Sequence, residues 1–296
     1  MNGNIPAKAT SDATQRFVFE NADLRGEIVQ LDKAYRELLA LHEYSPGVRA
    51  LLGEFLAAAV LLSTTLKFDG RLVLQARSNG QIPLLMAECS SNLGIRGIAR
   101  GAQNATAEQF EQLLRDGHLA ITIEPDSGQR YQGVVPLDGD SLASCLDHYF
   151  EQSEQLSTRL WLGTDESRAA GMLLQQLPPN RVQNPLERTR QWEQACALGQ
   201  TISTSELLEL LPQDILQRLF AEETIQLFDS QPIRFECTCS RERTLAALTS
   251  IGAQEVASII EEQGSVIMDC EFCNNRYQFQ ADELDHLLDT DNVTVH

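Results

Sequence analysis

The chain has 296 residues, 43% hydrophobic and 22% charged, which is typical of a folded protein long enough for a sizeable core and a second unit. Its 42 acidic residues outnumber 23 Lys and Arg, so the formal net charge is −19. Such a surplus repels phosphate backbones and anionic lipid, and we therefore expect neither nucleic acid nor a membrane as a partner.

Neither export nor membrane insertion is expected from the hydrophobic pattern. The first sixteen residues have no apolar stretch behind a basic segment, which argues against a secretory signal and for a cytoplasmic protein. The most apolar run, residues 50–66, contains Glu54 and is shorter than the roughly 20 residues that a membrane span needs. A buried helix is the expected structure of this run.

Strand and helix patterns are mixed through residues 1–180, which predicts an α+β domain with a mixed sheet-and-helix core. Period-two alternation predicts strands at 16–20, 24–31, 70–77, 82–89, 94–100, 119–124, 130–135, 158–163 and 169–177. Helical spacing predicts helices at 32–44, 46–67, 106–115 and 141–154, the third capped by Thr106. The fourth should bury one face, formed by Leu142, Cys145, Leu146 and Tyr149.

Residues 181–236 are predicted to form a helical linker region. A Pro- and Asn-rich break at 178–185 precedes short amphipathic helices such as 206–211 and 213–220, followed by strand-like residues 224–228 and 233–236. These helices are too few to form a core of their own and must pack on a neighbour. We therefore expect this linker to be metastable.

Four of the seven cysteines form two tight pairs in the last sixty residues. The chain reads CysThrCys at 237–239 and, thirty residues later, CysGluPheCys at 270–273. Residues two apart on an extended chain point to the same side, and the second spacing is that of a metal-binding turn. Four thiolates give the closed tetrahedral shell of structural zinc, so the sequence predicts a small zinc-binding domain over 237–296 with one ion. The predicted ligands are Cys237, Cys239, Cys270 and Cys273.

Other interpretations of these cysteines remain open. They could be buried thiols without metal, although chance would then have to produce two tight pairs. Cys270 and Cys273 could instead form a thiol-disulfide oxidoreductase site, but no βαβ unit surrounds them and a zinc-bound thiolate has limited access. A nucleic-acid-binding zinc ribbon is disfavoured because residues 237–296 have three arginines against eleven acidic residues.

Zinc could be a structural staple or a redox switch. A disulfide within the CysXaaCys pair closes a very small, strained ring of the labile kind. A domain of about sixty residues is also too small to fold unaided, so loss of the metal should unfold it. Oxidation of the ligands would then cause local unfolding, and this unfolding could extend to the marginal 181–236 region.

The cysteine pattern resembles that of the redox-regulated 33 kDa chaperonin, or heat-shock protein 33, family. The motif CysThrCysSerArgGluArg at 237–243 and the later CysGluPheCys match the family's CysXaaCys and CysXaaXaaCys signature. The resemblance extends along the chain through LeuLysPheAspGly at 66–70, ArgTyrGlnGlyValVal at 130–135, SerGluGlnLeu at 153–156 and AlaGlyMetLeuLeuGln at 170–175.

The resemblance implies an ATP-independent holdase that binds unfolding client proteins under oxidative stress. The reduced, zinc-bound form would be inactive, and oxidation would form the disulfides Cys237–Cys239 and Cys270–Cys273, release zinc and activate a homodimer. It further implies that residues 1–180 bind clients and dimerise and that residues 237–296 are the redox switch. No phosphate-binding loop is found, and no histidine lies in a nucleophile motif, so an enzyme is not expected. Cys89, Cys145 and Cys196 should pack as small apolar groups.

Overall fold

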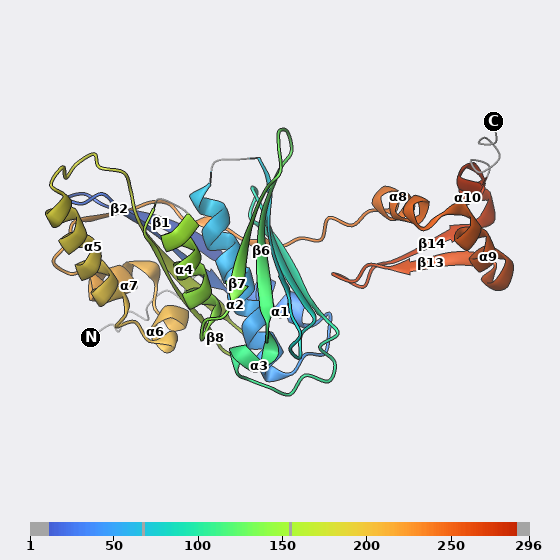
Figure 1. The fold of residues 1–296 in the computed structure, drawn as a ribbon, viewed down its shortest axis with the longest axis horizontal. Helices are drawn as coiled ribbons and strands as arrows, with labels where there is room; N and C mark the ends of the chain where they lie inside the picture. The colour runs from blue at the N-terminus through green and yellow to red at the C-terminus, as the bar shows by residue number, and fades with distance from the viewer. Residues whose placement is uncertain (1–11, 67–68, 154–155, 289–296) are drawn as a thin grey trace, which may run out of the picture. The chain divides into compact units, whose positions relative to one another are not determined.

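The computed structural model describes residues 12–66, 69–153 and 156–288. The chain forms two compact units, Met1–Glu236 and Cys237–His296, which are treated separately below. Helices and antiparallel sheets are mixed in both, so the α+β fold class is confirmed (Figure 1). Residues 67 and 154, where two predicted helices end, lie outside the described residues. Residues 181–236 are described with the first unit, because contacts join them to it.

One sheet of the first unit joins the N-terminal strands to residues from the middle of the chain. Its strand order is β10-β1-β2-β9-β8, with β11 also paired to β1. The strands are β1 (Ala13–Phe19), β2 (Leu24–Leu31), β8 (Thr158–Thr164), β9 (Ala169–Gln176), β10 (Ile225–Leu227) and β11 (Gln231–Pro232). We call this sheet A.

The second sheet of the first unit, sheet B, has the order β12-β5-β4-β3-β6-β7. Its strands are β3 (Gly70–Arg77), β4 (Leu84–Ser90), β5 (Gly94–Arg100), β6 (Gly117–Pro125), β7 (Tyr131–Leu137) and β12 (Arg234–Phe235). The hairpin predicted at 119–135 is confirmed as β6 and β7. Only β12 pairs in parallel, and it brings the chain just before Cys237 against β5.

Helix α2 (Pro46–Thr65) lies between sheets A and B and contacts strands of both. Small residues in the sheets allow this close approach: a Cβ atom at Gly97 would lie 3.0 Å from Leu52, and one at Gly171 would lie 2.8 Å from Leu61. The helix is long and apolar enough to cross a membrane, but 78% of its most apolar window is buried inside the protein. It is therefore a core helix, as predicted.

Three shorter helices complete this part of the unit: α1 (Lys33–Leu39), α3 (Phe110–Leu113) and α4 (Leu142–Ser153). The predicted face of α4 is buried. The helix predicted over 106–115 is wrong in length, and Thr106 does not cap it. The Gln81 side chain accepts hydrogen bonds from the backbone N–H groups of Thr106 and Ala107, which holds these residues outside the helix, and Gln109 is the N-cap.

Residues 181–236 form α5 (Pro185–Gly199), α6 (Thr204–Glu209) and α7 (Pro212–Leu219). The 15-residue α5 was not predicted as one helix, because the Pro- and Asn-rich stretch before it was interpreted as a break. Two of those residues start the helix: the Asn184 side chain accepts from the N–H groups of Leu186 and Glu187, and Pro185 is the first helical residue.

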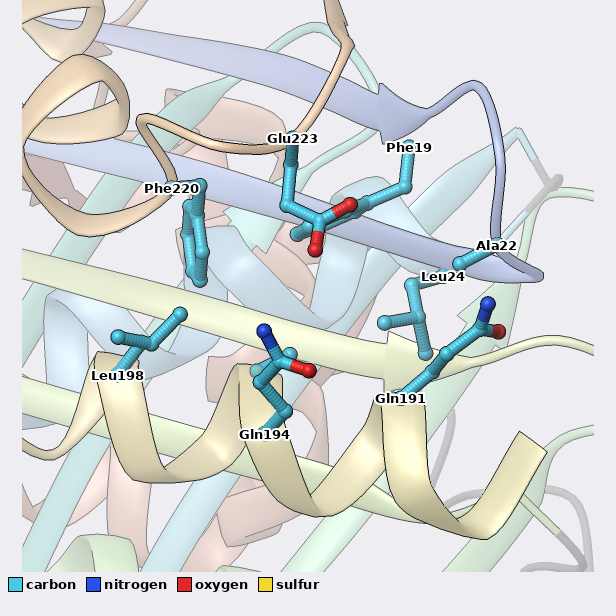
Figure 2. A pocket seen from close by; sticks show the side chains of 9 residues that line it. Phe19, Ala22, Leu24, Gln191, Gln194, Leu198, Phe220 and Glu223 are labelled. Carbon is cyan, nitrogen blue, oxygen red and sulfur yellow. The ribbon is translucent and has the colours of Figure 1, made fainter. Parts of the chain in front are cut away.

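The three helices cover the face of sheet A that points away from α2 (Figure 1). Apolar side chains of sheet A such as Phe17, Phe19 and Ile28 meet Leu216 and Phe220 there, and all five are at most 5% exposed. Figure 2 shows a small pocket at one edge of this contact, between the β1–β2 turn and α5, where Gln191, Gln194 and Glu223 lie beside apolar groups. Polar groups therefore reach the margin of an otherwise apolar interface.

The C-terminal module, residues 237–288, has two helices, a hairpin and a last helix. These are α8 (Arg241–Ile251), α9 (Ala253–Gln263), β13 (Ser265–Asp269), β14 (Arg276–Gln280) and α10 (Ala281–Leu288). Its described residues include five buried hydrophobic side chains, Leu248, Val256, Val266, Phe279 and Leu284. The core of the module is therefore small.

Candidate metal centre

The four cysteines predicted as ligands come from two places in the C-terminal module. Cys237 and Cys239 lie on the stretch without regular structure that precedes α8, and Cys270 and Cys273 lie on the turn between β13 and β14. The hairpin and the start of α8 are thus the two elements that position the sulfur atoms.

The turn that holds Cys270 and Cys273 is closed by backbone hydrogen bonds. The Cys270 N–H donates to the Asn275 carbonyl at 2.8 Å, and the Asn274 N–H donates to the Cys270 carbonyl at 2.7 Å. Asn274 has φ of 58°, in the left-handed region that Asn tolerates better than most residues. Backbone hydrogen bonds therefore help to position this pair of thiols.

The four sulfur atoms meet in one cluster, and all lie within 4.8 Å of one another. Cys237 Sγ is 3.7 Å from Cys270 Sγ, and Cys239 Sγ is 3.4 Å from Cys273 Sγ. A tetrahedral shell with Zn–S bonds of about 2.3 Å would separate its sulfurs by about 3.8 Å. These separations therefore fit a tetrahedral ion of that size, and the cluster could hold a metal.

Polar groups outside the cluster point at one of its sulfurs. The Tyr277 hydroxyl donates to Cys239 Sγ at 3.1 Å, and Asn275 Nδ2 lies 3.9 Å from the same atom. Burial acts to raise the pKa of Cys239, but the hydrogen bonds from Tyr277 and the neighbouring thiols outweigh it and lower the pKa to about 7. For Cys237 and Cys273, burial raises the pKa. These hydrogen bonds therefore favour the thiolate form of Cys239.

Arginine side chains hold the elements around the cluster in place. Arg241 lies over the Phe279 ring, 4.3 Å from its centre, donates to the Gln278 carbonyl and pairs with Glu283. Arg276 pairs with Asp269 across the hairpin through two hydrogen bonds of 2.7 and 2.9 Å. The start of α8 is thereby tied to β14.

The remaining cysteines do not join the cluster. Cys89 and Cys145 are buried and Cys196 is half-buried, and none of the seven cysteines, all of which the structure describes, forms a disulfide. The contact between Tyr277 and Cys239 was not anticipated, because the two residues are 38 positions apart and no sequence pattern marks a hydrogen-bond donor to sulfur. They meet because the start of α8, next to Cys239, is held against β14 by Arg241.

Comparisons with known proteins agree on one family. Residues 12–280 match the family model described as Hsp33 protein. The chain is 50% identical over 281 residues to a 33 kDa chaperonin of Pseudomonas aeruginosa, strain UCBPP-PA14, covering 94% of this chain and 95% of the relative. It is 48% identical over 294 residues to that of Pseudomonas fluorescens, covering 97% and 98%.

A solved structure supports the fold. The crystal structure of the 33 kDa chaperonin from Thermotoga maritima superimposes with a TM-score of 0.79, covering 96% of this chain and all of that one at 23% identity. Because the family model and the relatives span nearly the whole chain, the conclusion covers both of its units. The chain belongs to the Hsp33 family of chaperones.

Proposed function

We propose that this chain is an ATP-independent, redox-regulated holdase whose cysteine cluster binds one zinc ion in the reduced form. The observation that carries the proposal is the gathering of four cysteine thiols, from two separate parts of a module with a small core, at separations that suit a tetrahedral ion. An ion held there would contribute folding free energy to the module and keep the thiolates in place.

Oxidation would convert the same side chains into two disulfides, Cys237–Cys239 and Cys270–Cys273. Each pair of thiolates would lose two electrons to one peroxide molecule, which takes up two protons and leaves as two molecules of water. The sulfur atoms would then no longer be available as ligands. The two parts of the module would lose their link, and a core of this size would not keep it folded.

The surface to be released is the apolar face of sheet A under residues 181–236. Phe19 and Phe220 pack edge to face across this contact, with ring centres 5.1 Å apart. Opening would expose large aromatic and aliphatic side chains, the kind of surface that binds unfolded proteins through the hydrophobic effect. We propose this face as the client-binding surface and residues 181–236 as its metastable cover.

The buried carboxylate of Asp23 binds the cover near its first residues. Asp23 accepts hydrogen bonds from the N–H groups of Asn180, Arg181 and Val182 at 2.9 to 3.2 Å, and from Arg188 Nη1 at 2.7 Å. Its side chain is 4% exposed, and that of Arg188 is 13% exposed. This buried pair joins Arg188 on α5 to the β1–β2 turn and therefore opposes detachment of the cover.

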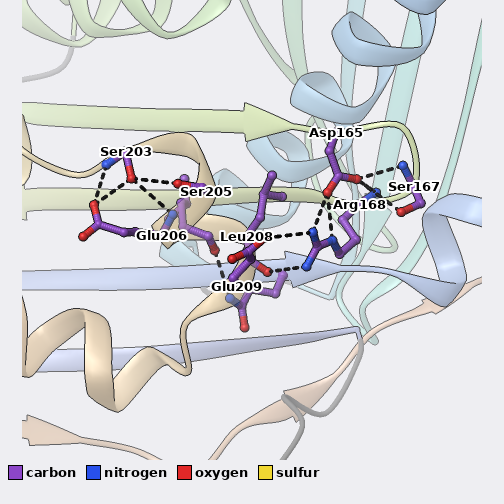
Figure 3. A network of polar contacts seen from close by, with 10 residues as sticks. Asp165, Ser167, Arg168, Ser203, Ser205, Glu206, Leu208 and Glu209 are labelled. Atoms are coloured by element: carbon purple, nitrogen blue, oxygen red, sulfur yellow. Dashed lines mark hydrogen bonds and ion pairs between the residues drawn. The ribbon is translucent and has the colours of Figure 1, made fainter.

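A second fastening joins α6 to the turn between β8 and β9 (Figure 3). Arg168 pairs with Asp165 on its own turn, donates to the Leu208 carbonyl at 3.4 Å and lies 3.6 Å from Glu209. The side chain of Glu209 is 62% exposed and that of Arg168 is 34% exposed, so these contacts are weaker than those of the more deeply buried Asp23 site. The cover would consequently open more readily at α6 than at the start of α5.

The partners that we propose are unfolded or partly unfolded client proteins and, in the oxidised form, a second copy of the chain. Relatives of the chain are named chaperonins. The alternative, a thiol-disulfide oxidoreductase, is less well supported, because all four thiols of the predicted site lie in one mutual cluster in which each would be a ligand. We therefore assign no enzymatic activity and expect the protein to act in the cytoplasm.

One experiment separates these functions. Reduced, zinc-loaded protein is treated with peroxide while zinc release and the aggregation of a heat-denatured client are followed together. We expect suppression of aggregation to appear as zinc is released, without ATP, and to reverse with reductant. Release of zinc without suppression would refute the holdase, and catalytic reduction of a test disulfide would favour the oxidoreductase.

A further inference from the structure

Three half-buried glutamines lie on the face of sheet A that residues 181–236 cover, one on each of its three central strands. Gln15 is on β1, Gln30 on β2 and Gln176 on β9. Each continues the two-residue repeat of the apolar side chains that meet the cover, as Gln15 does before Phe17 and Gln30 does after Ile28. Polar groups in such surroundings need hydrogen-bond partners. Their partners therefore indicate what this face can bind.

Gln30 binds the end of α6 through main-chain groups. Its Nε2 atom donates hydrogen bonds to the carbonyl oxygens of Leu207 and Leu210, at 2.9 and 2.8 Å. These carbonyls lie in the last turn and at the C-cap of the helix, where carbonyl groups lack partners within the helix. The two hydrogen bonds therefore use a group that every type of residue carries.

The other two glutamines make contacts of the same kind elsewhere on the cover. Gln15 Nε2 donates to the Phe228 carbonyl at 2.7 Å, and Gln176 Nε2 donates to the Arg188 carbonyl at 3.1 Å. The edge of β1 adds main-chain pairing with β10, and the Phe228 N–H donates to the Arg16 carbonyl at 2.9 Å. Sheet A thus holds its cover by apolar packing together with hydrogen bonds that do not depend on the sequence of the cover.

We propose that Gln15, Gln30 and Gln176 bind the main-chain carbonyls of client proteins after the cover has left sheet A. The inference rests on the proposed function, because it names what the same surface recognises. Folded proteins pair nearly all of their buried carbonyls internally, whereas an unfolded segment has carbonyls that are bound only to water. The opened surface therefore selects segments that lack internal hydrogen bonds, and it accepts them whatever their sequence.

Replacement of Gln30 by Met separates this contact from purely hydrophobic binding. Met has a similar length and is more apolar, so Gln30→Met strengthens hydrophobic binding while it removes both donated hydrogen bonds. The measurement is the concentration of oxidised, full-length protein that halves the aggregation of heat-denatured citrate synthase. We expect this concentration to be about fivefold higher for Gln30→Met than for wild type, within the range of about two- to tenfold for one hydrogen bond.

The same substitution should have the opposite effect in the reduced protein. There the lost hydrogen bonds are those to α6, so the cover opens more readily and suppression of aggregation rises above that of wild type. Gln132→Met is the matched control, because Gln132 is an exposed strand residue on β7 of sheet B, where it donates to Thr122 Oγ1 at 3.2 Å. It should match wild type in both states.

Hydrogen exchange of β1, β2 and β9 checks that sheet A stays folded in each oxidised protein, and Gln15→Met decides the test if Gln30→Met does not fold. Suppression by the folded, oxidised variant that equals or exceeds wild type would overturn the inference and leave the holdase proposal intact. An equal loss in Gln132→Met would also overturn it. If oxidised wild type itself does not suppress aggregation, the holdase proposal fails, and the inference fails with it.

Discussion

The two units of the chain reach stability by different physical means. The first packs α2 between two six-stranded sheets, with large side chains such as Tyr35, Phe55 and Leu56 completely buried. The C-terminal module has only five buried hydrophobic side chains among its described residues and a cluster of four thiols in addition. A core of the first kind survives chemical change at its surface, whereas a module of the second kind depends on the state of a few sulfur atoms.

Residues 181–236 differ from both the large core of the first unit and the C-terminal module. They have no core of their own, and their helices bury apolar side chains only by packing on sheet A. Backbone pairing also continues to the end of the first unit, where the Glu236 N–H donates to the Ile95 carbonyl at 2.9 Å, directly before Cys237 in the chain. A cover that depends on a neighbouring surface can leave while that surface stays folded, and the predictions below test this difference.

The largest effect is expected from Cys273→Ser. Loss of one of four ligands should remove most of a metal-binding free energy of about 10 kcal/mol or more, so the module should unfold even in reductant. Hydrogen exchange should show residues 237–288 unprotected and β1, β2 and β9 unchanged, with no zinc bound. Cys196→Ser is the control and should retain both zinc and the fold of the module, since Cys196 lies on α5 outside the cluster. Retained zinc in Cys273→Ser would refute the ligand set.

A smaller effect is expected from Phe220→Ala, which truncates a side chain that is 3% exposed between α7 and sheet A. The cover should be destabilised by about 3 to 5 kcal/mol, while the module keeps its metal. We expect partial suppression of client aggregation in the reduced protein. Leu186→Ala, at a position that is 82% exposed, should behave as wild type. A Phe220→Ala protein that opens by hydrogen exchange but binds no client would separate cover opening from client binding.

The next prediction compares the loss of stability when either of two arginines on α5 is replaced. Arg188 pairs with the buried Asp23, whereas Arg190 pairs with Glu187 and is 72% exposed. Arg188→Gln leaves a buried carboxylate without its cation and should cost about 3 kcal/mol, at the lower end for a broken buried pair, because three backbone donors remain. Arg190→Gln should cost less than about 0.5 kcal/mol. Exchange protection of α5 measures both, and equal values would contradict the fastening at Asp23.

A pH effect on stability is expected in the first unit. Burial raises the pKa of Glu27 from 4.5 to about 7, although the hydrogen bond from Thr14 acts in the opposite direction. The protonated form is favoured in the folded state, so the stability it contributes is present below pH 4.5 and is lost as the pH rises to 7. The loss should be at most about 3 kcal/mol.

Glu27→Gln should remove this loss. Both tryptophans, Trp161 and Trp192, lie in the first unit, so their fluorescence during denaturant unfolding at pH 5 and pH 8 reports on that unit. An unchanged pH dependence in the variant would show that Glu27 is not the group responsible.

Strands of sheet B such as β3 were predictable because one face of the sheet meets the core around α2, which imposes alternation on their sequences. Errors arose where a side chain from elsewhere decides the local structure. Gln81 keeps Thr106 out of a helix, and Asn184 starts α5 within residues that looked like a break. The sequence at 106–115 contains no sign of the first contact, and an Asn-Pro start signals the second only when the helix after it is considered.

The cysteine cluster was predictable for a different reason. Spacing constrains four ligands of one ion so strongly that the local motifs identify them without knowledge of the fold. The donors around the cluster are not constrained in this way. The position of Tyr277 depends on the register in which β13 and β14 pair, and the position of Cys239 depends on the contacts that Arg241 makes with β14.

The central claim, that oxidation of the module uncovers sheet A, is tested most directly by hydrogen exchange during peroxide treatment with a client present. We predict that residues 237–288 lose protection first, that α5, α6 and α7 follow, and that suppression of aggregation appears with this second step while β1, β2 and β9 remain protected. Suppression of aggregation while α5, α6 and α7 remain fully protected would contradict the account.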